Sequence, residues 1–408
     1  METKVVLDPV HGYIEIDDFQ AKLLDTPRMQ RLRRIRQLGF SNMVYPGANH
    51  TRFEHSMGVM YLASKAFEMG DITLSKPEER EELMTAALLH DIGHGPFSHA
   101  TEKIIETYCM RHHDDVKNIL SSGQIGDLLR DHGLKPSKIA AHISGETMIS
   151  RILSSEIDVD KMDYLARDMH YTGVTSGGVD SIRLLKHMGF YGKNFVLLPN
   201  AVMAAESLLA SRYWMNSSVY YHHVSRIAET MCSRACTYLI ETKSIRPQEF
   251  ELLDDIGLMA AMRQDNEKNG NDSFACEIAR RLDNRDLYKR ALYEGIDVVG
   301  EDVFRHRKNI SRIEKEIAEN AGVDVSDVMV DIPQKPMIAE MKAQIVGKKI
   351  QYLTEVSPFI SVLGKAHTEN WKMGVFAPKE KLEDVRKAAY DFFDVQNVKK
   401  TKQNTLFE

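Results

Sequence analysis

Residues 84–99 read Met84-Thr-Ala-Ala-Leu-Leu-His-Asp-Ile-Gly-His-Gly-Pro-Phe-Ser-His99 and join an apolar run to a histidine-rich loop. The run from Met84 to Leu89 is apolar or small on nearly every side, which is typical of a helix buried at the centre of a bundle. His90 and Asp91 end this helix, and the glycines that follow permit a turn through which both side chains reach one point. The stretch therefore predicts a helical bundle with a polar site at the end of its central helix.

Helical patterns continue on both sides of this stretch, and most strand-like runs come late. Thr26-Pro27 begins a helix that Gly39 ends, since proline fits the first turn of a helix. Further helices are expected at 52–69, 83–92, 147–168, 201–242, 274–294, 301–320 and 378–393, and strands at 4–7, 195–198, 351–363 and 372–376. We expect a mainly α protein, with a helical core over residues 1–250 and a smaller mixed α+β C-terminal lobe over 251–408 that ends in a polar tail from Val398.

The composition excludes several classes of protein. The formal net charge of −6 over 408 residues argues against a protein that coats nucleic acid along its whole surface. The four cysteines show no CxxC pair, and no apolar stretch approaches the roughly 18 residues of a membrane span. The N-terminus lacks the pattern of an export signal. We therefore expect a soluble, cytoplasmic protein with reduced cysteines and no membrane partner.

Two histidines and two carboxylates in separated segments are candidate ligands for one divalent metal ion: His55, His90, Asp91 and Asp160. A metal-dependent hydrolase needs such ligands at one point, with a position left for water. Any one of these histidines alone is more often a core or helix-end residue with a satisfied hydrogen bond. The pair His-Asp at the end of an apolar helix, with two more histidines close behind it, favours a metal site. These ligands suit Mn, Fe, Co, Ni, Zn or Mg, so the metal stays open.

Three segments carry a resemblance to a known family. Residues 52–58 (Arg52-Phe-Glu-His-Ser-Met-Gly58), 89–99 and 157–168 resemble the HD-domain deoxynucleoside triphosphate triphosphohydrolases, including the vertebrate enzyme with SAM and HD domains and its prokaryotic relatives. The resemblance runs from about Lys4 to His222 and returns weakly near Arg285. It implies the multi-helix HD-domain phosphohydrolase fold and the cleavage of a dNTP to a deoxynucleoside and inorganic triphosphate. We expect no SAM domain in this chain.

The resemblance also implies substrate contacts. A triphosphate carries about four negative charges, so cationic donors are needed beside the metal. The residues that match the phosphate contacts of the family are Arg52, Lys161, Tyr164 and Arg212. Tyr220 lies in the same segment as Arg212, which keeps the arginine and the tyrosine of the family. Residues matching the sugar contacts are Gln37 and Asp168 at the 3′-hydroxyl and Leu38 where a 2′-hydroxyl would intrude. Asn216 and His223 differ from the vertebrate enzyme, which leaves the contacts near them open.

Several residues are candidates for protonating the leaving oxygen. An imidazole with its ordinary pKa near 6.5 suits this step at neutral pH. The candidates are His94, His99 and a histidine at 112 or 113, with Glu102 in the place of a family aspartate that orients one of them. We prefer His113 held by Glu102. The alternative for His94 and His99 is a supporting hydrogen bond to groups around the metal.

The arginine-rich segment 28–36 has three interpretations: a solvated face, a less favoured nucleic-acid patch, or a nucleotide effector site. The resemblance favours the third, because several residues match a guanine-nucleotide activator site that a second subunit closes: Lys4, Asp25, Gln30 and Arg33, with Arg285 and Lys289 from the other subunit. It implies a homotetramer. Activation by GTP or dGTP is a hypothesis, and Mg would accompany the nucleotide phosphates. Leu7 weakens this hypothesis, because the family has a polar residue at that position.

Two other functions remain open. The HD fold also serves nucleoside monophosphatases and phosphodiesterases, for which Lys161 and Arg212 would have less phosphate to hold. A nucleotide-binding or nucleic-acid-binding protein without catalysis is the other alternative, with the arginine-rich segment as its binding surface. The phosphate product of the reaction distinguishes another HD phosphohydrolase from a dNTP triphosphohydrolase. Substitution of the metal ligands identifies a protein without catalysis, because its binding activity would survive.

Overall fold

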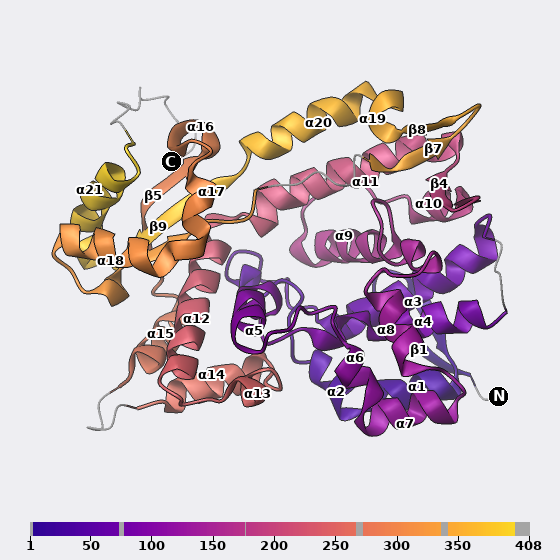
Figure 1. Ribbon diagram of the computed structural model, residues 1–408, viewed down its shortest axis with the longest axis horizontal. Coiled ribbons are helices and arrows are strands. Elements are labelled where there is room, and N and C mark those ends of the chain that lie inside the picture. The colour runs from indigo at the N-terminus through magenta and orange to yellow at the C-terminus, as the bar shows by residue number, and fades with distance from the viewer. Residues whose placement is uncertain (1–2, 73–76, 176, 267–271, 336–341, 396–408) are drawn as a thin grey trace.

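Helices make up most of the structure, a computed structural model that describes residues 3–72, 77–175, 177–266, 272–335 and 342–395 (Figure 1). Its strands form three small sheets. The first is the antiparallel hairpin of β1 (Lys4–Asp8) and β2 (Gly12–Ile16). The mainly α prediction is therefore confirmed. The predicted polar tail from Val398 lies outside the described residues.

The central helix of the N-terminal part is α4 (Glu78–Leu89), which packs against α3 (Arg52–Met69). Leu83 and residues 86–89 are fully buried, as the apolar run predicts. A short 3-10 turn (His90–Gly93) follows α4 directly and carries His90 and Asp91. The helix α9 (Val159–Thr172) packs on the other side of α3. The ends of these elements therefore meet where the candidate metal ligands lie.

Two predicted helices are shorter than expected. The segment from Thr26 forms α2 only over Pro27–Leu32, because the backbone of Arg36 pairs with Thr51 and with the Asp255 carboxylate. The run 147–168 contains a 3-10 turn (Ile149–Ile152) before α9 begins. The remaining helices of the N-terminal part are α1 (Asp18–Leu24), α5 (Glu102–Tyr108), α6 (Lys117–Ser121), α7 (Gly123–Asp131), α8 (Pro136–Ile143) and α10 (Ser181–Lys186).

The predicted helix over 201–242 is divided. It consists of α11 (Val202–Met215), one π-helical turn (Asn216–Tyr220) and α12 (His223–Glu241). π-helical turns are rare and often lie at functional sites. The helices that follow are α13 (Pro247–Phe250), α14 (Asp255–Gln264) and α15 (Phe274–Asp283). The helix predicted over 274–294 is wrong beyond Asp283, since Arg285 has a φ of 55° and the chain then forms a strand.

The C-terminal lobe holds a three-stranded sheet in the order β5 (Lys289–Gly295), β9 (Lys372–Ala377), β6 (Met329–Asp331). Its apolar side chains are buried with those of α18 (Ile310–Ala321) and α21 (Leu382–Phe392). Short helices α16 (Ile296–Val299) and α17 (Val303–His306) precede α18, so the predicted helix over 301–320 is interrupted. The strand predicted over 372–376 is confirmed.

The strand predicted over 351–363 is wrong after Tyr352. Only β8 (Ile350–Tyr352) is extended, and α19 (Leu353–Val356) and α20 (Pro358–Glu369) follow it. The Ser357 hydroxyl accepts the backbone N–H of Ile360 and so caps α20, with Pro358 in its first turn. β8 belongs to a four-stranded sheet with β3 (Met188–Tyr191), β4 (Asn194–Leu197) and β7 (Gln344–Val346).

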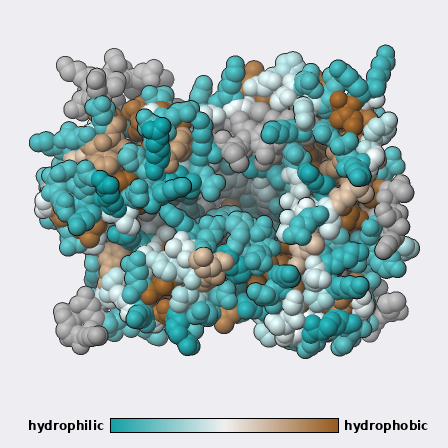
Figure 2. All heavy atoms as spheres, in the orientation of Figure 1, coloured by the Kyte–Doolittle hydropathy of each residue, from teal (hydrophilic) through white to brown (hydrophobic). Residues whose placement is uncertain are grey.

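Strands β7 and β8 return the chain to the N-terminal part, and α20 then runs beside α11 and leads back to β9 in the C-terminal lobe (Figure 1). Leu353 and Ile360 share one buried core with residues as early as Ile14. The division of the chain at residue 250 stays a prediction. The surface in Figure 2 is mostly hydrophilic, with apolar residues scattered over it. Within the described part of the chain, no helix combines the length and the apolarity needed to cross a membrane.

Candidate metal centre and active-site cavity

The four predicted metal ligands lie together, and we call them the four-ligand cluster: His55, His90, Asp91 and Asp160. The Nε2 atoms of His55 and His90 face each other at 3.3 Å. Asp160 Oδ1 lies 3.0 Å from His55 Nε2 and 3.5 Å from His90 Nε2. Asp91 approaches the same two nitrogens at 3.7 and 3.4 Å. Helix α3, the turn after α4 and the first turn of α9 thus direct two imidazoles and two carboxylates to one point.

The outer nitrogens of both histidines are held by hydrogen bonds. His55 Nδ1 donates to Asp163 Oδ2 at 2.7 Å, and His90 Nδ1 donates to the Ala87 carbonyl at 2.8 Å. These bonds leave each Nε2 lone pair toward the cluster, which is the arrangement of metal-bound histidines. Burial lowers the pKa of His55, but the hydrogen bonds to Asp160 and Asp163 outweigh it and raise the pKa to about 10. The donor set fits a divalent cation, and its binding would release protons.

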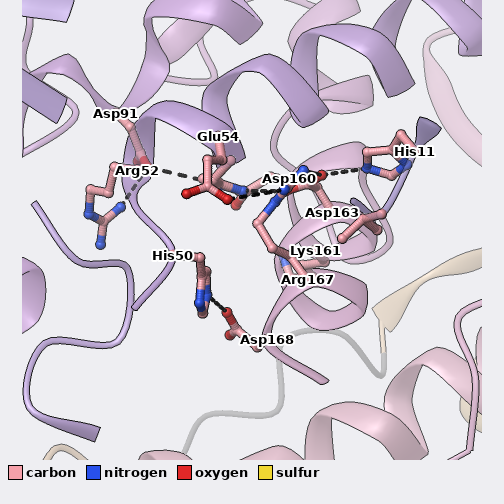
Figure 3. A network of polar contacts seen from close by, with 12 residues as sticks. His11, His50, Arg52, Glu54, Asp91, Asp160, Lys161, Asp163, Arg167 and Asp168 are labelled. Carbon is pink, nitrogen blue, oxygen red and sulfur yellow. Dashed lines mark hydrogen bonds and ion pairs between the residues drawn. The ribbon is translucent and has the colours of Figure 1, made fainter. Parts of the chain in front are cut away.

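A buried ionic network supports His55 from behind (Figure 3). Asp163 accepts from Arg167 Nε and Nη2, each at 2.9 Å, and it also contacts His11. Arg167 is fully buried and pairs with Asp8 at 2.8 Å. Sequence reasoning missed these residues. The spacing of Asp163 and Arg167, four positions apart on one helix, is the only sign of them in the sequence.

The four-ligand cluster opens into a cavity of about 560 Å³. Asp160, Tyr164 and Asp168 are spaced one turn apart, so α9 presents them along one face over about 12 Å. The cavity is lined by all the predicted substrate residues: Gln37, Leu38, Arg52, Lys161, Tyr164, Asp168, Arg212 and Tyr220. It is therefore a single pocket with metal ligands at one end of α9 and Asp168 two turns away.

Two cationic side chains lie close to the four-ligand cluster, Arg52 buried and Lys161 partly buried. Lys161 Nζ donates to Asp158 Oδ2 at 2.8 Å, and the Asp158 charge raises the pKa of Lys161 although burial opposes it. Arg52 Nη1 donates to Asp91 Oδ2 at 2.7 Å, while its Nη2 is buried with no hydrogen bond. Lys161 therefore remains a cation at neutral pH, and Arg52 keeps a donor for an anionic ligand.

The Asp168 end of the cavity is organised by hydrogen bonds. Asp168 accepts from His50 Nε2 at 2.7 Å (Figure 3). It also accepts from the Tyr220 hydroxyl at 2.5 Å. His50 was not predicted, because a lone histidine before α3 gives no sign of its partner. The Gln37 Oε1 atom is buried without a hydrogen-bond partner. This end of the cavity thus holds a fixed carboxylate and an acceptor suited to a hydroxyl group.

The predicted acid candidates lie around Glu102. His99 Nδ1 lies 3.0 Å from Glu102 Oε2, and His113 Nδ1 contacts the other carboxylate oxygen. His94 stacks on His113 with ring centroids 4.3 Å apart. Burial and the Arg52 charge hold the pKa of His94 well below its ordinary value. His94, His99 and His113 line the cavity, and Glu102 supports two of them from outside it.

The loop between His94 and His99 is held by side chains that the sequence did not reveal. Phe97 and Ser98 have φ values of 54° and 53°, which non-glycine residues rarely adopt. Asp255 accepts the backbone N–H of Phe97 at 2.6 Å, and Arg31 Nη2 donates to the His94 carbonyl at 2.9 Å. The arginine-rich segment therefore contributes a buried support for the cavity, in addition to its exposed residues.

The predicted effector residues lie in two places. Gln30 on α2 and Arg33, which directly follows it, are joined by a hydrogen bond of 3.0 Å from Arg33 Nε. Arg285 and Lys289 line a separate pocket of about 450 Å³ with two further cations, Arg290 and Lys379. Lys4 lies in β1, and Asp25 directly follows α1. Among the contacts of the described residues, none joins Arg285 or Lys289 to the other four.

Two family models match successive regions of the chain, and several known proteins resemble it along much of its length. The HD domain family matches residues 52–168, and the HD associated region matches residues 179–404. An uncharacterized protein of Methanocaldococcus jannaschii is 33% identical over 94% of this chain and 81% of its own length. The Dictyostelium discoideum deoxynucleoside triphosphate triphosphohydrolase SAMHD1 homolog is 32% identical over 70% of this chain. The Bos taurus deoxynucleoside triphosphate triphosphohydrolase SAMHD1 is 29% identical over 84% of this chain.

The chain spans 60% and 64% of the lengths of these two triphosphohydrolases. Two solved structures share the fold along the whole of their chains. A hypothetical protein from Aquifex aeolicus aligns with a TM-score of 0.76 over 95% of this chain, at 26% identity. A phosphohydrolase from Bacteroides thetaiotaomicron aligns with a TM-score of 0.73 over 92% of it, also at 26% identity. Together with the geometry above, these matches show that the chain belongs to the HD-domain family and joins an HD domain to an HD associated region.

Proposed function

We propose that this protein is a metal-dependent triphosphohydrolase that cleaves a dNTP to a deoxynucleoside and inorganic triphosphate. The observation that carries the proposal is the single cavity that joins the four-ligand cluster, the cations Arg52 and Lys161, and the Asp168 carboxylate two turns along α9. The names of the Dictyostelium and bovine relatives agree with this reaction.

The four-ligand cluster would hold the metal ion. When bound, the ion supplies a Lewis acid for a phosphoryl oxygen and lowers the pKa of a bound water. We further propose Mg on the phosphates of the nucleotide. Arg52, Lys161 and Arg212 bind the phosphate chain with fixed positive charge, and Tyr164 adds a hydroxyl donor. Such preorganised donors stabilise developing charge without a reorganisation cost at the moment of reaction.

The Asp168 end of the cavity recognises the sugar. Tyr220 and His50 both donate to Asp168, so its carboxylate is fixed in place to accept a bond from the 3′-hydroxyl. Gln37 offers its unpartnered Oε1 to the same group. Leu38 lines the cavity as an apolar wall. A ribose 2′-hydroxyl placed against this wall would lose its water without gaining a partner, at a cost of roughly 1–3 kcal/mol.

We propose His113, held by Glu102, as the general acid for the leaving oxygen. His113 Nδ1 lies against the Glu102 carboxylate in a close charge contact that is not aligned as a hydrogen bond, and Nε2 is the atom left to carry the proton that is transferred. His99 is the alternative, because its Nδ1 is also paired with Glu102. His94 lies between Asp91 and His113 and positions both.

Activation is a separate proposal. GTP or dGTP would bind between Gln30 and Arg33 of one subunit and Arg285 and Lys289 of another, within a homotetramer. The cationic pocket around Arg285 supports an anionic ligand there. A dNTPase assay with and without GTP tests this step, and equal rates would remove it.

Product analysis tests the main proposal. The metal-loaded protein is incubated with each dNTP and each NTP, alone and in pairs, and the phosphate product is identified. Inorganic triphosphate from dNTPs is expected. Orthophosphate or pyrophosphate would instead indicate another HD phosphohydrolase. The variant His90→Ala/Asp91→Ala is the control and should show no hydrolysis. If this variant kept the only measurable activity, the protein would be a nucleotide-binding or nucleic-acid-binding protein.

A further inference from the structure

A second group of metal-ligand side chains lies where the cavity wall meets the surface, and we call it the outer cluster: Glu102, Glu106, His112 and His113. Glu102 and Glu106 are one turn apart on α5, and the two histidines follow in the loop after it. His112 Nε2 lies 3.4 Å from Glu106 Oε1 and 3.8 Å from Glu102 Oε1. His113 Nδ1 approaches the same oxygen of Glu102. Donor atoms of Glu102, His112 and His113 all lie within 4.8 Å of one another.

The outer nitrogen of His112 is held as in a metal site. His112 Nδ1 donates to Asp114 Oδ1 at 2.7 Å, which leaves the Nε2 lone pair toward Glu102 and Glu106. Metal-bound histidines almost always donate their other nitrogen to a carboxylate or carbonyl in this way. Asp114 thus acts on His112 as Asp163 acts on His55 in the four-ligand cluster.

The second histidine has a donor atom with no hydrogen bond. His113 Nδ1 is buried, and its close contact with Glu102 is not aligned as a hydrogen bond. A buried polar atom without a partner is costly and needs an explanation. A bound cation would explain why His113 Nδ1 makes no hydrogen bond, because ligands of one metal ion point to the ion and not to one another.

We propose that the outer cluster is a second divalent metal site, distinct from the four-ligand cluster. Two carboxylates and two neutral imidazoles balance the charge of one divalent cation. Donor atoms of Glu102, His112 and His113 lie within 4.8 Å of one another, and Glu106 is 3.4 Å from His112, so a cation such as Zn²⁺, with bonds of about 2.0–2.1 Å, would fit among them once His113 and Glu102 move apart. Imidazole and carboxylate ligands also accept Co²⁺, Ni²⁺ and Mn²⁺.

Occupation of the outer cluster would inhibit hydrolysis, and this consequence rests on the proposed function. Glu102 and His113 form the proposed acid pair, and a cation bound to His113 Nδ1 keeps the ring from becoming an imidazolium, so the proton on Nε2 is held by a much weaker acid. Glu106 takes no part in that chemistry. The alternative to a bound metal is a protonated His112, whose positive charge would lie between the same carboxylates. Burial lowers the pKa of His112, but Asp114 and the two glutamates outweigh it and raise the pKa.

The number of bound metal ions distinguishes a metal ion in the outer cluster from a protonated His112. Metal-free protein is titrated with Zn²⁺ in a calorimeter, and the bound ions are counted by mass spectrometry after desalting. The wild-type chain should bind about two ions, one in each cluster, and Glu106→Gln/His112→Ala about one. The matched control is Glu81→Gln/His132→Ala, which removes an ion pair of the same residue types outside the cavity and should still bind about two. Far-UV circular dichroism checks that each variant is folded.

Two results would overturn the second site: a wild-type chain that binds one ion, or a Glu106→Gln/His112→Ala variant that still binds two. Excess Zn²⁺ should also slow hydrolysis by the wild-type protein at least tenfold, while Glu106→Gln, which leaves every candidate acid in place, keeps its basal rate and resists the inhibition. Equal inhibition of both proteins would contradict the inhibitory effect. The metal count does not depend on any substrate, so it tests the site even if the protein hydrolyses no dNTP.

Discussion

The carboxylate of Asp255 accepts the backbone N–H of Phe97 at 2.6 Å, so the start of α14 holds the loop that joins His94 to His99. Its other oxygen accepts the backbone N–H of Arg36 at 3.0 Å. Left-handed backbone at Phe97 and Ser98 costs on the order of 1–3 kcal/mol for each residue. The two hydrogen bonds to Asp255 help to offset this cost and keep both histidines at the cavity wall.

The substitution Asp255→Asn should lower kcat with little change in KM. An amide has one acceptor oxygen, so one of the two N–H groups loses its partner, at roughly 1–3 kcal/mol of unfolding free energy. The loop carries His99, the alternative acid, and His94, which stacks on the proposed acid His113, but no residue proposed to contact the substrate. We expect kcat to fall about tenfold or more, which corresponds to about 1.4 kcal/mol in the barrier.

The matched control for this variant is Asp254→Asn. Asp254 caps the same helix through the backbone N–H of Gly257 and pairs with Arg34, but it makes no bond to the loop. Asparagine still caps the helix, so only the ion pair with Arg34 is lost; the unfolding free energy should fall by no more than about 1 kcal/mol and kcat should stay near the wild-type value. A similar fall of kcat in both variants would mean that Asp255 acts through stability alone.

The sequence indicated the four metal ligands because each lies in a motif or at a helix end. The residues that hold these ligands in place from other parts of the chain lie in no motif that the sequence reveals. Asp8 and Arg167 are 159 positions apart, yet they pair at 2.8 Å, and nothing in the local pattern around Asp8 indicates that partner. Long-range partners of this kind depend on how α9 packs against β1, which periodicity does not describe.

Errors in the predicted fold have a similar cause. The run 351–363 is rich in β-branched and apolar residues, which favours a strand in isolation. The cap from Ser357 and Pro358 in the first turn begin α20 instead, and packing against α11 stabilises it. Tertiary contacts therefore outweighed local propensity here, whereas the fully apolar run before His90 left no alternative to a buried helix.

Replacing Asp163 with Asn should weaken metal binding by the four-ligand cluster. Asp163 accepts from His55 Nδ1, and loss of such an outer partner typically reduces metal affinity 10–100-fold. The affinity is measured by titration of the metal-free protein with Mn²⁺. Asp8→Asn is the control, because it disturbs the same Arg167 without touching His55. Equal losses in the two variants would assign the effect to Arg167.

Replacing Leu38 with Ala should reduce the preference for dNTPs over NTPs. Leu38 is an apolar part of the cavity wall, and a smaller side chain leaves room for the 2′-hydroxyl and a water molecule. The ratio of kcat/KM for a dNTP to that for the matching NTP should fall about 5- to 100-fold. An unchanged ratio would show that another residue excludes ribose.

The stability of the C-terminal lobe should depend on pH through Glu314. This side chain is 2% exposed, accepts the backbone N–H of Val330 at 3.1 Å and pairs with Arg234. Burial dominates and raises its pKa from 4.5 to about 7. The folded state then binds the proton more tightly than the unfolded state, so the free energy of unfolding falls as the pH rises from about 4.5 to 7.

The variant Glu314→Gln isolates this contribution, because glutamine does not titrate. A shift from 4.5 to about 7 corresponds to roughly 3 kcal/mol. The unfolding free energy of the variant relative to wild type should therefore increase by about that amount between pH 4.5 and pH 8, as measured by urea unfolding across the range. Glu319→Gln, an exposed substitution on the same helix, should show no such trend. A flat difference for Glu314→Gln would mean that the Arg234 charge keeps Glu314 ionised in the folded protein despite its burial.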